Sequence, residues 1–393
     1  MRFIIFLTVF LSLYSGLHLY GFLSVKRALM PGPKANVAVI LFMVMMILAP
    51  ITVRLLERND LITMARFLAY IGYIWMGLLF LFFSFAVVLD VFRFILEATQ
   101  RAFNTNFTVF SLSKAQCFFV PLCLSVGITI FGFFEALNIK TERIIIRTDT
   151  ITQKIGRLKI VQISDVHLGL IVGENRLRKI VERIKAEKPD VLVSTGDLID
   201  GQMNNMSDLA GMIREIPTKY GKYAVTGNHE FYAGLKNTMK LTTDAGFKVL
   251  RGEGLNIPGV MNIAGVDDPT GKRYGLTPSV SEKVLLSKLP REYFTLLLKH
   301  RPQLNGAEGW LFDLQLSGHT HKGQIFPFSL IVNLFYRHFN GLARLGNHSY
   351  IYVSRGTGTW GPPVRFLSPP EVTVIELVHQ SKGSHQKGPK KNT

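Results

Sequence analysis

This chain of 393 residues has only two cysteines, and its first third has few charged residues. Its only cysteines, Cys117 and Cys123, lie within one apolar stretch, so the rest of the chain has no thiols for a disulfide framework. That absence fits a reducing compartment. Charge is scarce in residues 1–137, which hold ten Lys or Arg and five Asp or Glu, whereas the remainder holds 35 and 22. An ordinary water-soluble domain is therefore excluded for the first third, and the chain divides into a membrane part and a water-soluble part.

Four apolar stretches, each of about 21 residues or more, occupy the membrane part, and about 20 helical residues suffice to cross ~30 Å of hydrocarbon. They span residues 3–23, 36–56, 67–92 and 115–137. The first is predicted to be a retained helix and not a cleaved signal peptide. No clear small-x-small cleavage site follows it, and Lys26 and Arg27 are typical of a membrane-edge anchor. The sequence therefore predicts a transmembrane domain of four helices over residues 1–137, in an inner or plasma membrane.

The basic residues beside these spans predict their orientation. With the N-terminus inside, ten Lys or Arg lie near the inner ends of the spans and six lie in the outer loops. Because basic residues favour the cytoplasmic side, the water-soluble part is predicted to be cytoplasmic.

Beyond residue 150, short β-branched apolar runs alternate with amphipathic segments. The first half predicts parallel βαβ units, with strands at 159–164, 191–195 and 223–226 and helices at 175–188 and 206–216. The second half has strand-like runs with little helix between them, which predicts antiparallel pairing. We assign residues 138–154 to a linker, 155–378 to one α/β domain and 379–393 to a basic, disordered tail.

Five polar clusters follow the apolar runs and form the main functional signal. They are Asp165-x-His167, Gly196-Asp197-x-x-Asp200, Gly227-Asn228-His229-Glu230, Lys299-His300 and Gly318-His319-x-His321. Carboxylate, imidazole and amide groups in this number suffice for two neighbouring divalent metal ions, which can activate a hydroxide and bind phosphoryl oxygens. Each cluster alone has a plain structural interpretation, such as a turn or a buried histidine. Their joint order at strand ends favours the metal site.

In these clusters the chain resembles the calcineurin-like metallophosphoesterase superfamily, over about residues 155–380. Within that superfamily, Gly318–Ile325, Tyr350–Gly358 and Pro369-Pro370-Glu371 resemble a bacterial membrane-associated branch that includes UDP-2,3-diacylglucosamine hydrolases. The resemblance implies a four-layer α/β/β/α sandwich and two divalent metal ions, either Mn, Fe or Zn.

The resemblance also implies roles for individual residues. One metal would be held by Asp165, His167, Asp197 and His321, and the second by Asp197, Asn228, His300 and His319. His229 would protonate the leaving group or bind the phosphate, and Asp200 would orient His229.

Departures from the family pattern bear on the substrate. Ser/Thr protein phosphatases of the superfamily carry arginine where this chain has Gly201 and Thr226, so a protein substrate is not expected. Arg301 is predicted either to bind an anionic substrate or to face solvent. The acidic pair Asp267-Asp268 is predicted to form a solvated turn.

Residues 325–345 are rich in aromatic and aliphatic side chains directly after two predicted ligands. Either this segment forms a lipid-facing or acyl-binding surface, with Arg337, His338 and Arg344 near headgroups, or it is ordinary core packing.

The sequence as a whole predicts a membrane-anchored phosphohydrolase in which a metal-bridging hydroxide attacks a phosphodiester or pyrophosphate bond. Its expected partners are membrane lipids and a phosphoester substrate, for example a lipid-linked nucleotide such as UDP-2,3-diacylglucosamine. One alternative is a metal-dependent nuclease or cyclic-nucleotide phosphodiesterase, although scattered basic residues argue against nucleic acid. Another is a membrane sensor or transporter with a regulatory phosphoesterase-like domain.

Overall fold

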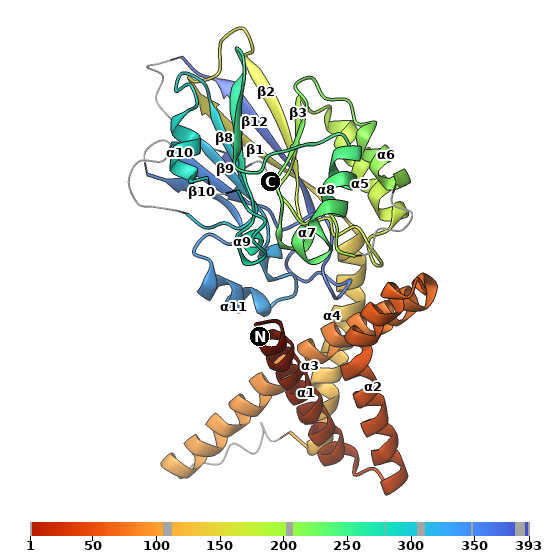
Figure 1. The fold of residues 1–393 in the computed structure, drawn as a ribbon. Helices are drawn as coiled ribbons and strands as arrows, with labels where there is room; N and C mark the ends of the chain where they lie inside the picture. Colours follow the sequence, from red (N-terminus) through yellow and green to blue (C-terminus); the bar gives the residue numbers. More distant parts are fainter. Residues whose placement is uncertain are drawn as a thin grey trace. The chain divides into compact units, whose positions relative to one another are not determined.

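The structure, a computed structural model, describes residues 2–104, 112–201, 207–278, 280–304, 311–346, 349–381 and 390–391. The chain divides into two compact units, both drawn in Figure 1. One unit comprises residues 1–134 with 361–364, and the other comprises residues 135–360 with 365–393.

Long apolar helices build the first unit. They are α1 (Arg2–Leu29), α2 (Pro33–Arg58), α3 (Ile62–Phe103) and α4 (Lys114–Leu137), whose last residues belong to the second unit. All four are long and apolar enough to cross a membrane, which confirms the prediction of four long apolar helices. α3 has 42 residues and is longer than the predicted 67–92. The helix continues past the apolar stretch into a charged segment, where Arg101 pairs with Glu97.

Small residues allow α2 and α3 to pack closely. Ala49 is buried, and a Cβ added to Gly72 would lie 2.9 Å from the Ala49 Cβ. Close backbone approach of this kind is a common way for membrane helices to associate. A hydrogen bond from Trp75 Nε1 to His18 Nε2, 2.9 Å long, joins α3 to α1.

The second unit contains two β-sheets, of which the first has the strand order β13-β1-β12-β2-β3-β4-β5. Its strands are β1 (Lys140–Thr148), β2 (Arg157–Ile163), β3 (Val191–Ser194), β4 (Lys222–Ala224), β5 (Lys248–Val249), β12 (Glu371–His379) and β13 (Lys390–Lys391). Strands β2 to β5 are parallel, as predicted for the first half. The helices α5 (Glu174–Glu187), α6 (Ser207–Arg214) and α8 (Leu235–Asp244) lie in the connections between them.

Strand β1 lies inside the segment 138–154 that the sequence assigns to a linker. It pairs with β12 along its whole length, from Lys140 beside Glu371 to Thr148 beside His379. These nine residues therefore belong to the sheet. The predicted tail, 379–393, falls largely outside the described residues, although the strand β13 within it pairs with β1.

The second sheet has the order β10-β11-β9-β8-β7-β6. Its strands are β6 (Glu253–Ile257), β7 (Met261–Val266), β8 (Thr295–Lys299), β9 (Leu314–Ser317), β10 (Gly341–Leu345) and β11 (Ser349–Val353). The predicted antiparallel pairing is wrong for its centre, because β7, β8, β9 and β11 are parallel. The edge pairs β6–β7 and β10–β11 are antiparallel. Those two connections are short, whereas the central strands are joined by long crossovers that parallel pairing requires.

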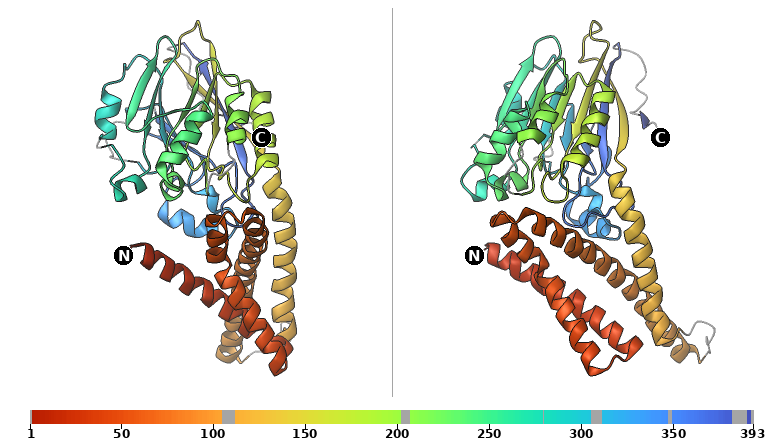
Figure 2. Two further views of the ribbon diagram at one scale, coloured as in Figure 1. Left: turned by 45° about the vertical axis from the view of Figure 1, so that its right-hand side comes forward. Right: turned by 90° about the vertical axis from the view of Figure 1, so that its right-hand side faces the viewer.

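Side chains alternate between the two faces of the first sheet. On β2, Leu158 and Ile160 face the second sheet, while Val161 and Ile163 face the helices. On the outer face of the second sheet, α10 (Glu282–Ser287) packs through Leu285 and its neighbours. The result is the predicted four-layer α/β/β/α sandwich, whose layers can be followed in Figure 2.

Candidate metal centre

The predicted ligands lie in loops at one edge of the two sheets. Asp165 and His167 follow β2, Asp197 follows β3, and Asn228 begins the short helix α7 (Asn228–Tyr232) after β4. In the second sheet, His300 follows β8, and His319 and His321 follow β9. Because β2, β3 and β4 are parallel in the first sheet and β8 and β9 are parallel in the second, their C-terminal ends share an edge within each sheet, where sites of open α/β sheets are usually found.

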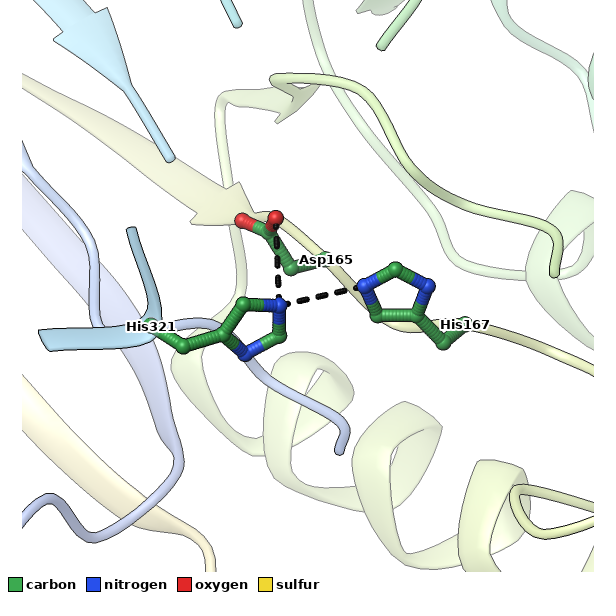
Figure 3. Close-up of side chains that lie close together, drawn as sticks. All are labelled: Asp165, His167 and His321. Atoms are coloured by element: carbon green, nitrogen blue, oxygen red, sulfur yellow. Dashed lines mark hydrogen bonds and ion pairs between the residues drawn. The ribbon is translucent and has the colours of Figure 1, made fainter. Parts of the chain in front are cut away.

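Asp165, His167 and His321 form the first group of ligand atoms, and Figure 3 shows them pointing toward one another. The Nε2 atoms of His167 and His321 lie 3.1 Å apart. His321 Nε2 is 3.5 Å from Asp165 Oδ1. All three side chains are buried, and the backbone N–H of His319 donates to both carboxylate oxygens of Asp165 at 3.0 Å.

Asp197, His300 and His319 form the second group. His300 Nε2 lies 3.2 Å from Asp197 Oδ2 and 3.2 Å from His319 Nδ1. The side-chain oxygen of Asn228 is 3.3 Å from the same His300 nitrogen. Asp197 Oδ2 also lies 3.9 Å from His167 Nε2, so this one carboxylate reaches both groups. The structure thus brings all seven predicted metal ligands together.

Five of these seven residues adopt a backbone conformation that side chains other than glycine rarely adopt. Their φ values are 51° for Asp165, 54° for His167, 52° for Asp197, 71° for His319 and 48° for His321. Each such residue costs about 1–3 kcal/mol, and strain of this kind clusters at functional sites. The strain here coincides with the converging donor atoms, which favours a site kept for its chemistry.

Known proteins share this sequence pattern. Residues 158–323 match the family model of the calcineurin-like phosphoesterases. An uncharacterised metallophosphoesterase from Aquifex aeolicus is 39% identical over 255 residues, which cover 65% of this chain and 97% of that protein. The chain belongs to the calcineurin-like metallophosphoesterase family.

Two further relatives of this metallophosphoesterase are informative. A Danio rerio protein named as a transmembrane protein with a metallophosphoesterase domain is 31% identical over 273 residues, covering 66% of this chain and 62% of that protein. An uncharacterised metallophosphoesterase from Bacillus subtilis is 32% identical over 257 residues, covering 62% of this chain and 87% of that protein. Both relatives support a metallophosphoesterase domain, and the name of the Danio rerio protein, together with the four long apolar helices, supports a membrane protein. The narrower resemblance to UDP-2,3-diacylglucosamine hydrolases stays a prediction.

Burial keeps three histidines of the metallophosphoesterase site neutral. It is the main cause that lowers the pKa of His167 to about 4 and that of His319 to about 3. It also holds the pKa of His321 well below the ordinary value. A neutral imidazole is the form that ligates a metal ion, so these rings are prepared for that role.

The buried carboxylate of Asp197 needs a positive charge beside it. Burial alone would raise its pKa, but His300 and His229 outweigh burial and hold the pKa well below the ordinary value. Against the effect of burial, Asp197 in turn raises the pKa of His300 to about 10. A cation at this position would neutralise Asp197 as the His300 proton does. The oxygen and imidazole donors therefore fit divalent metal ions.

His229 lies beside Asp200 at the rim of the metallophosphoesterase site. Its Nδ1 is 2.6 Å from Asp200 Oδ1, and its backbone N–H donates to Asp197 Oδ1 at 2.8 Å. Burial would lower the pKa of His229, but Asp197 and Asp200 raise it to about 9. The ring of Trp360 lies 5.8 Å from the His229 ring. His229 also lies within ligand distance of His167 and Asp197.

The contacts of the Asp267-Asp268 pair correct one prediction and exclude one of the two alternatives for Arg301. Arg301 donates to the fully buried Asp268 from Nε at 2.7 Å and from Nη2 at 3.3 Å, and it also donates to Thr270. Asp267 is buried as well and pairs with Arg251 at 2.8 Å. The predicted solvated turn is wrong, because two arginines take the place of water. Arg301 does not simply face solvent either, because its Nε and Nη2 donate to protein acceptors, whereas its binding of an anionic substrate stays a prediction.

Glu230 is a residue of the site to which the sequence assigns no role. Its carboxylate accepts backbone N–H groups of Asp197 at 3.0 Å, Leu198 at 2.8 Å and Gly227 at 2.6 Å. It thereby joins the loop after β3 to the loop after β4. Its place in the Gly227–Glu230 cluster is the signal that could have identified it.

Arg365 is a second such residue, and no sequence motif marks it. It is fully buried, its Nη2 lies 3.0 Å from His321 Nδ1, and it donates to the carbonyl groups of Arg355 and Gly358. Its charge disfavours protonation of His321. This role depends on a contact between residues 44 positions apart.

Proposed function

We propose that this protein is a membrane-anchored, two-metal hydrolase that cleaves a phosphodiester or pyrophosphate bond in a lipid-linked molecule. The position of Asp197 carries the proposal. Its Oδ2 atom lies 3.9 Å from His167 Nε2 in one group and 3.2 Å from His300 Nε2 in the other. A carboxylate between two sets of donor atoms is suited to bridge two cations, as two-metal phosphoryl-transfer sites require.

Seven residues would hold the metals in this proposal. Asp165, His167, Asp197 and His321 would hold one, and Asp197, Asn228, His300 and His319 would hold the other. When bound, divalent Mn, Fe or Zn would lower the pKa of water and polarise the phosphoryl oxygens.

His229 would supply the proton that the leaving oxygen needs. Asp200 Oδ1 lies 2.6 Å from His229 Nδ1 in an ion pair, which would orient the ring and leave Nε2 for the leaving group. The raised pKa of about 9 keeps the ring protonated at neutral pH, as a general acid requires. Glu230 would fix the loops that carry Asp197 and His229 relative to each other, because it accepts hydrogen bonds from both.

Three features favour a lipid-linked substrate. The chain has four helices able to span a membrane. Gly201 and Thr226 replace the arginine pair of the protein phosphatases. Trp360, which is 50% exposed, gives the site an apolar rim beside His229. A molecule such as UDP-2,3-diacylglucosamine combines an acyl group with a pyrophosphate bond. The basic residues beside the spans would place the site in the cytoplasm.

The test uses the full-length protein in detergent, loaded with Mn²⁺, with bis(p-nitrophenyl) phosphate as the diester. Asp197→Asn is expected to lower kcat/KM by about 10²–10³-fold or more, the range for removing one group that stabilises transition-state charge. Bound metal, measured by mass spectrometry, should fall with it. Glu182→Gln makes the same chemical change on an exposed carboxylate and should leave both values unchanged.

Equal metal content and kcat/KM in the two variants would overturn the metal-site assignment.

A competition assay, in which phospholipid vesicles or DNA are added to the diester reaction, then ranks the candidate substrates. Inhibition by phospholipid vesicles and not by DNA is expected, whereas stronger inhibition by DNA would overturn the lipid assignment and favour the nuclease alternative.

A further inference from the structure

An exposed apolar helix lies next to the metal centre. None of the eight side chains of α11 (Phe328–Phe335) is buried. Leu334 is 82% exposed, Phe335 is 78% exposed and Leu330 is 60% exposed. With its neighbours these residues form what we call the α11 surface: Phe326, Phe328, Leu330, Ile331, Leu334 and Phe335. The alternative of ordinary core packing is therefore wrong for this helix, and an apolar patch of this kind marks an interaction site.

The loops that hold α11 also hold two predicted ligands. The helix follows the short 3-10 turn η2 (His321–Gly323), and Tyr336 at its end packs against His319 with ring centroids 5.6 Å apart. Thr320, between the two histidines, donates to the carbonyl of Phe339 at 2.6 Å. The α11 surface thus lies at the ligand edge of the sandwich, as Figure 1 also shows for α7, α9 and α11.

The chain leaves its last membrane span close to the same edge. α4 ends at Leu137 and β1 begins at Lys140, so that only Asn138 and Ile139 lie between them. From Leu137 to Lys140 the chain advances by three residues, which span at most about 11 Å. The start of β1 is therefore held within about that distance of the end of the span.

Strand β12, which pairs with both β1 and β2, places the start of β1 at the same edge of the sheet as the ligands. Lys140 lies beside Glu371 at the start of β12, and Thr373 lies beside Gln162 near the end of β2, from which Asp165 follows. The β1–β2 turn, residues 149–156, lies at the other end of these strands.

Arg176 forms hydrogen bonds both to the end of α4 and to the rim of the site. Its Nη2 donates to the carbonyl of Ala136 at 2.6 Å, and its Nη1 donates to Thr359, next to Trp360, at 3.2 Å. The end of the last span and the rim of the metal centre therefore share one buried side chain.

We propose that the α11 surface lies in the interfacial layer of the bilayer that the chain's own helices span. The two-residue connection holds the ligand edge near the membrane, where apolar side chains gain by burial among lipids. Arg337 and Arg344 follow the helix and match anionic headgroups in charge. The metal centre then opens toward headgroups, so that a membrane lipid reaches it without leaving the bilayer. This inference rests on the fold and does not depend on the reaction proposed above.

The experiment places a nitroxide label on the full-length protein in vesicles of phosphatidylcholine and phosphatidylglycerol. Cys117 and Cys123 are first replaced by alanine, and single cysteines are then introduced as Leu334→Cys and Leu330→Cys. Gln153→Cys, at the exposed turn between β1 and β2, is the control at the opposite end of the sheet. Paramagnetic resonance measures how often each label collides with oxygen, which concentrates in lipid, and with a water-soluble nickel chelate.

We expect the labels at 334 and 330 to collide more with oxygen than with nickel, and the label at 153 to show the reverse. A label at 334 that is open to nickel would overturn the proposal. So would a label closed to both reagents, because another part of this chain or a second copy would then cover α11. Both substitutions replace exposed side chains, and unchanged circular dichroism verifies that the labelled proteins are folded.

Discussion

At the residue scale, the position of His229 suits proton transfer as well as metal binding. It lies within ligand distance of His167 and Asp197, yet its Nδ1 is 2.6 Å from Asp200. The two aspartates raise its pKa to about 9 against the effect of burial. An imidazole that is protonated at neutral pH and oriented by a carboxylate is suited to be a general acid.

His229→Gln tests this role. We expect kcat to fall by about 10²–10⁴-fold on a diester with an alkyl leaving group, the usual contribution of general acid catalysis. The loss should be much smaller with p-nitrophenol, which leaves without a proton. Because the protonated form is lost as pH rises through the pKa, the wild-type rate should fall above about pH 9, or lower once cations are bound. The variant should lack that decline. Equal losses on both substrates, or loss of bound metal, would contradict the role.

At the element scale, the loops after β3 and β4 approach each other more closely than a side chain allows. A Cβ added to Gly227 would lie 2.1 Å from Asp197 Oδ1. Backbone strain is not the reason, since the φ of Gly227 is −99°. Gly227 is thus required because the carboxylate of Asp197 leaves no room for a side chain at this position.

Gly227→Ala is therefore expected to displace Asp197 and to lower kcat/KM by about 10²-fold or more, the effect of a shift of about 1 Å in a catalytic group. Gly173→Ala is the matched control. Gly173 also precedes a helix, with φ −96°, and nothing lies within 4 Å of its added Cβ. Similar kinetics and metal content in the two variants would show that the close approach does not position Asp197.

At the scale of the whole molecule, the ligands come from both sheets of the sandwich. Asp165 and Asp197 follow strands of the first sheet, and His300 and His319 follow strands of the second. Cations bound by these residues would connect the two sheets at one edge. Their binding free energy would then add to the stability of the folded domain.

Metal removal should consequently lower the melting temperature. Free metal at about 1,000 times Kd stabilises the folded state by about 4 kcal/mol. In a domain of this size that corresponds to about 8–16 °C in Tm. Scanning calorimetry of the full-length protein in detergent, with and without EDTA, measures the shift. The chelator should have little effect on Asp197→Asn, and an unchanged Tm in the wild type would contradict metal binding at this edge.

Local patterns in the sequence were enough to predict the four apolar helices, the first sheet's parallel strands and the residues that converge on the site. Apolar runs of about 20 residues and polar groups at strand ends reflect physical needs that each segment meets alone, namely membrane thickness and strand burial. The sequence clusters therefore named Asp165, Asp197 and His300 without knowledge of their partners. The roles of those residues as ligands still await the experiments above.

Only the tertiary structure decided which distant groups meet. Asp268 is predicted from the sequence to lie in a solvated turn, but it is buried and forms an ion pair with the half-buried Arg301 across 33 positions. The parallel centre of the second sheet depends on long crossovers, and the exposure of α11 depends on what packs against it. Burial and pairing are properties of the folded molecule, because a side chain's neighbours from distant segments, and not its own sequence context, set its exposure and charge.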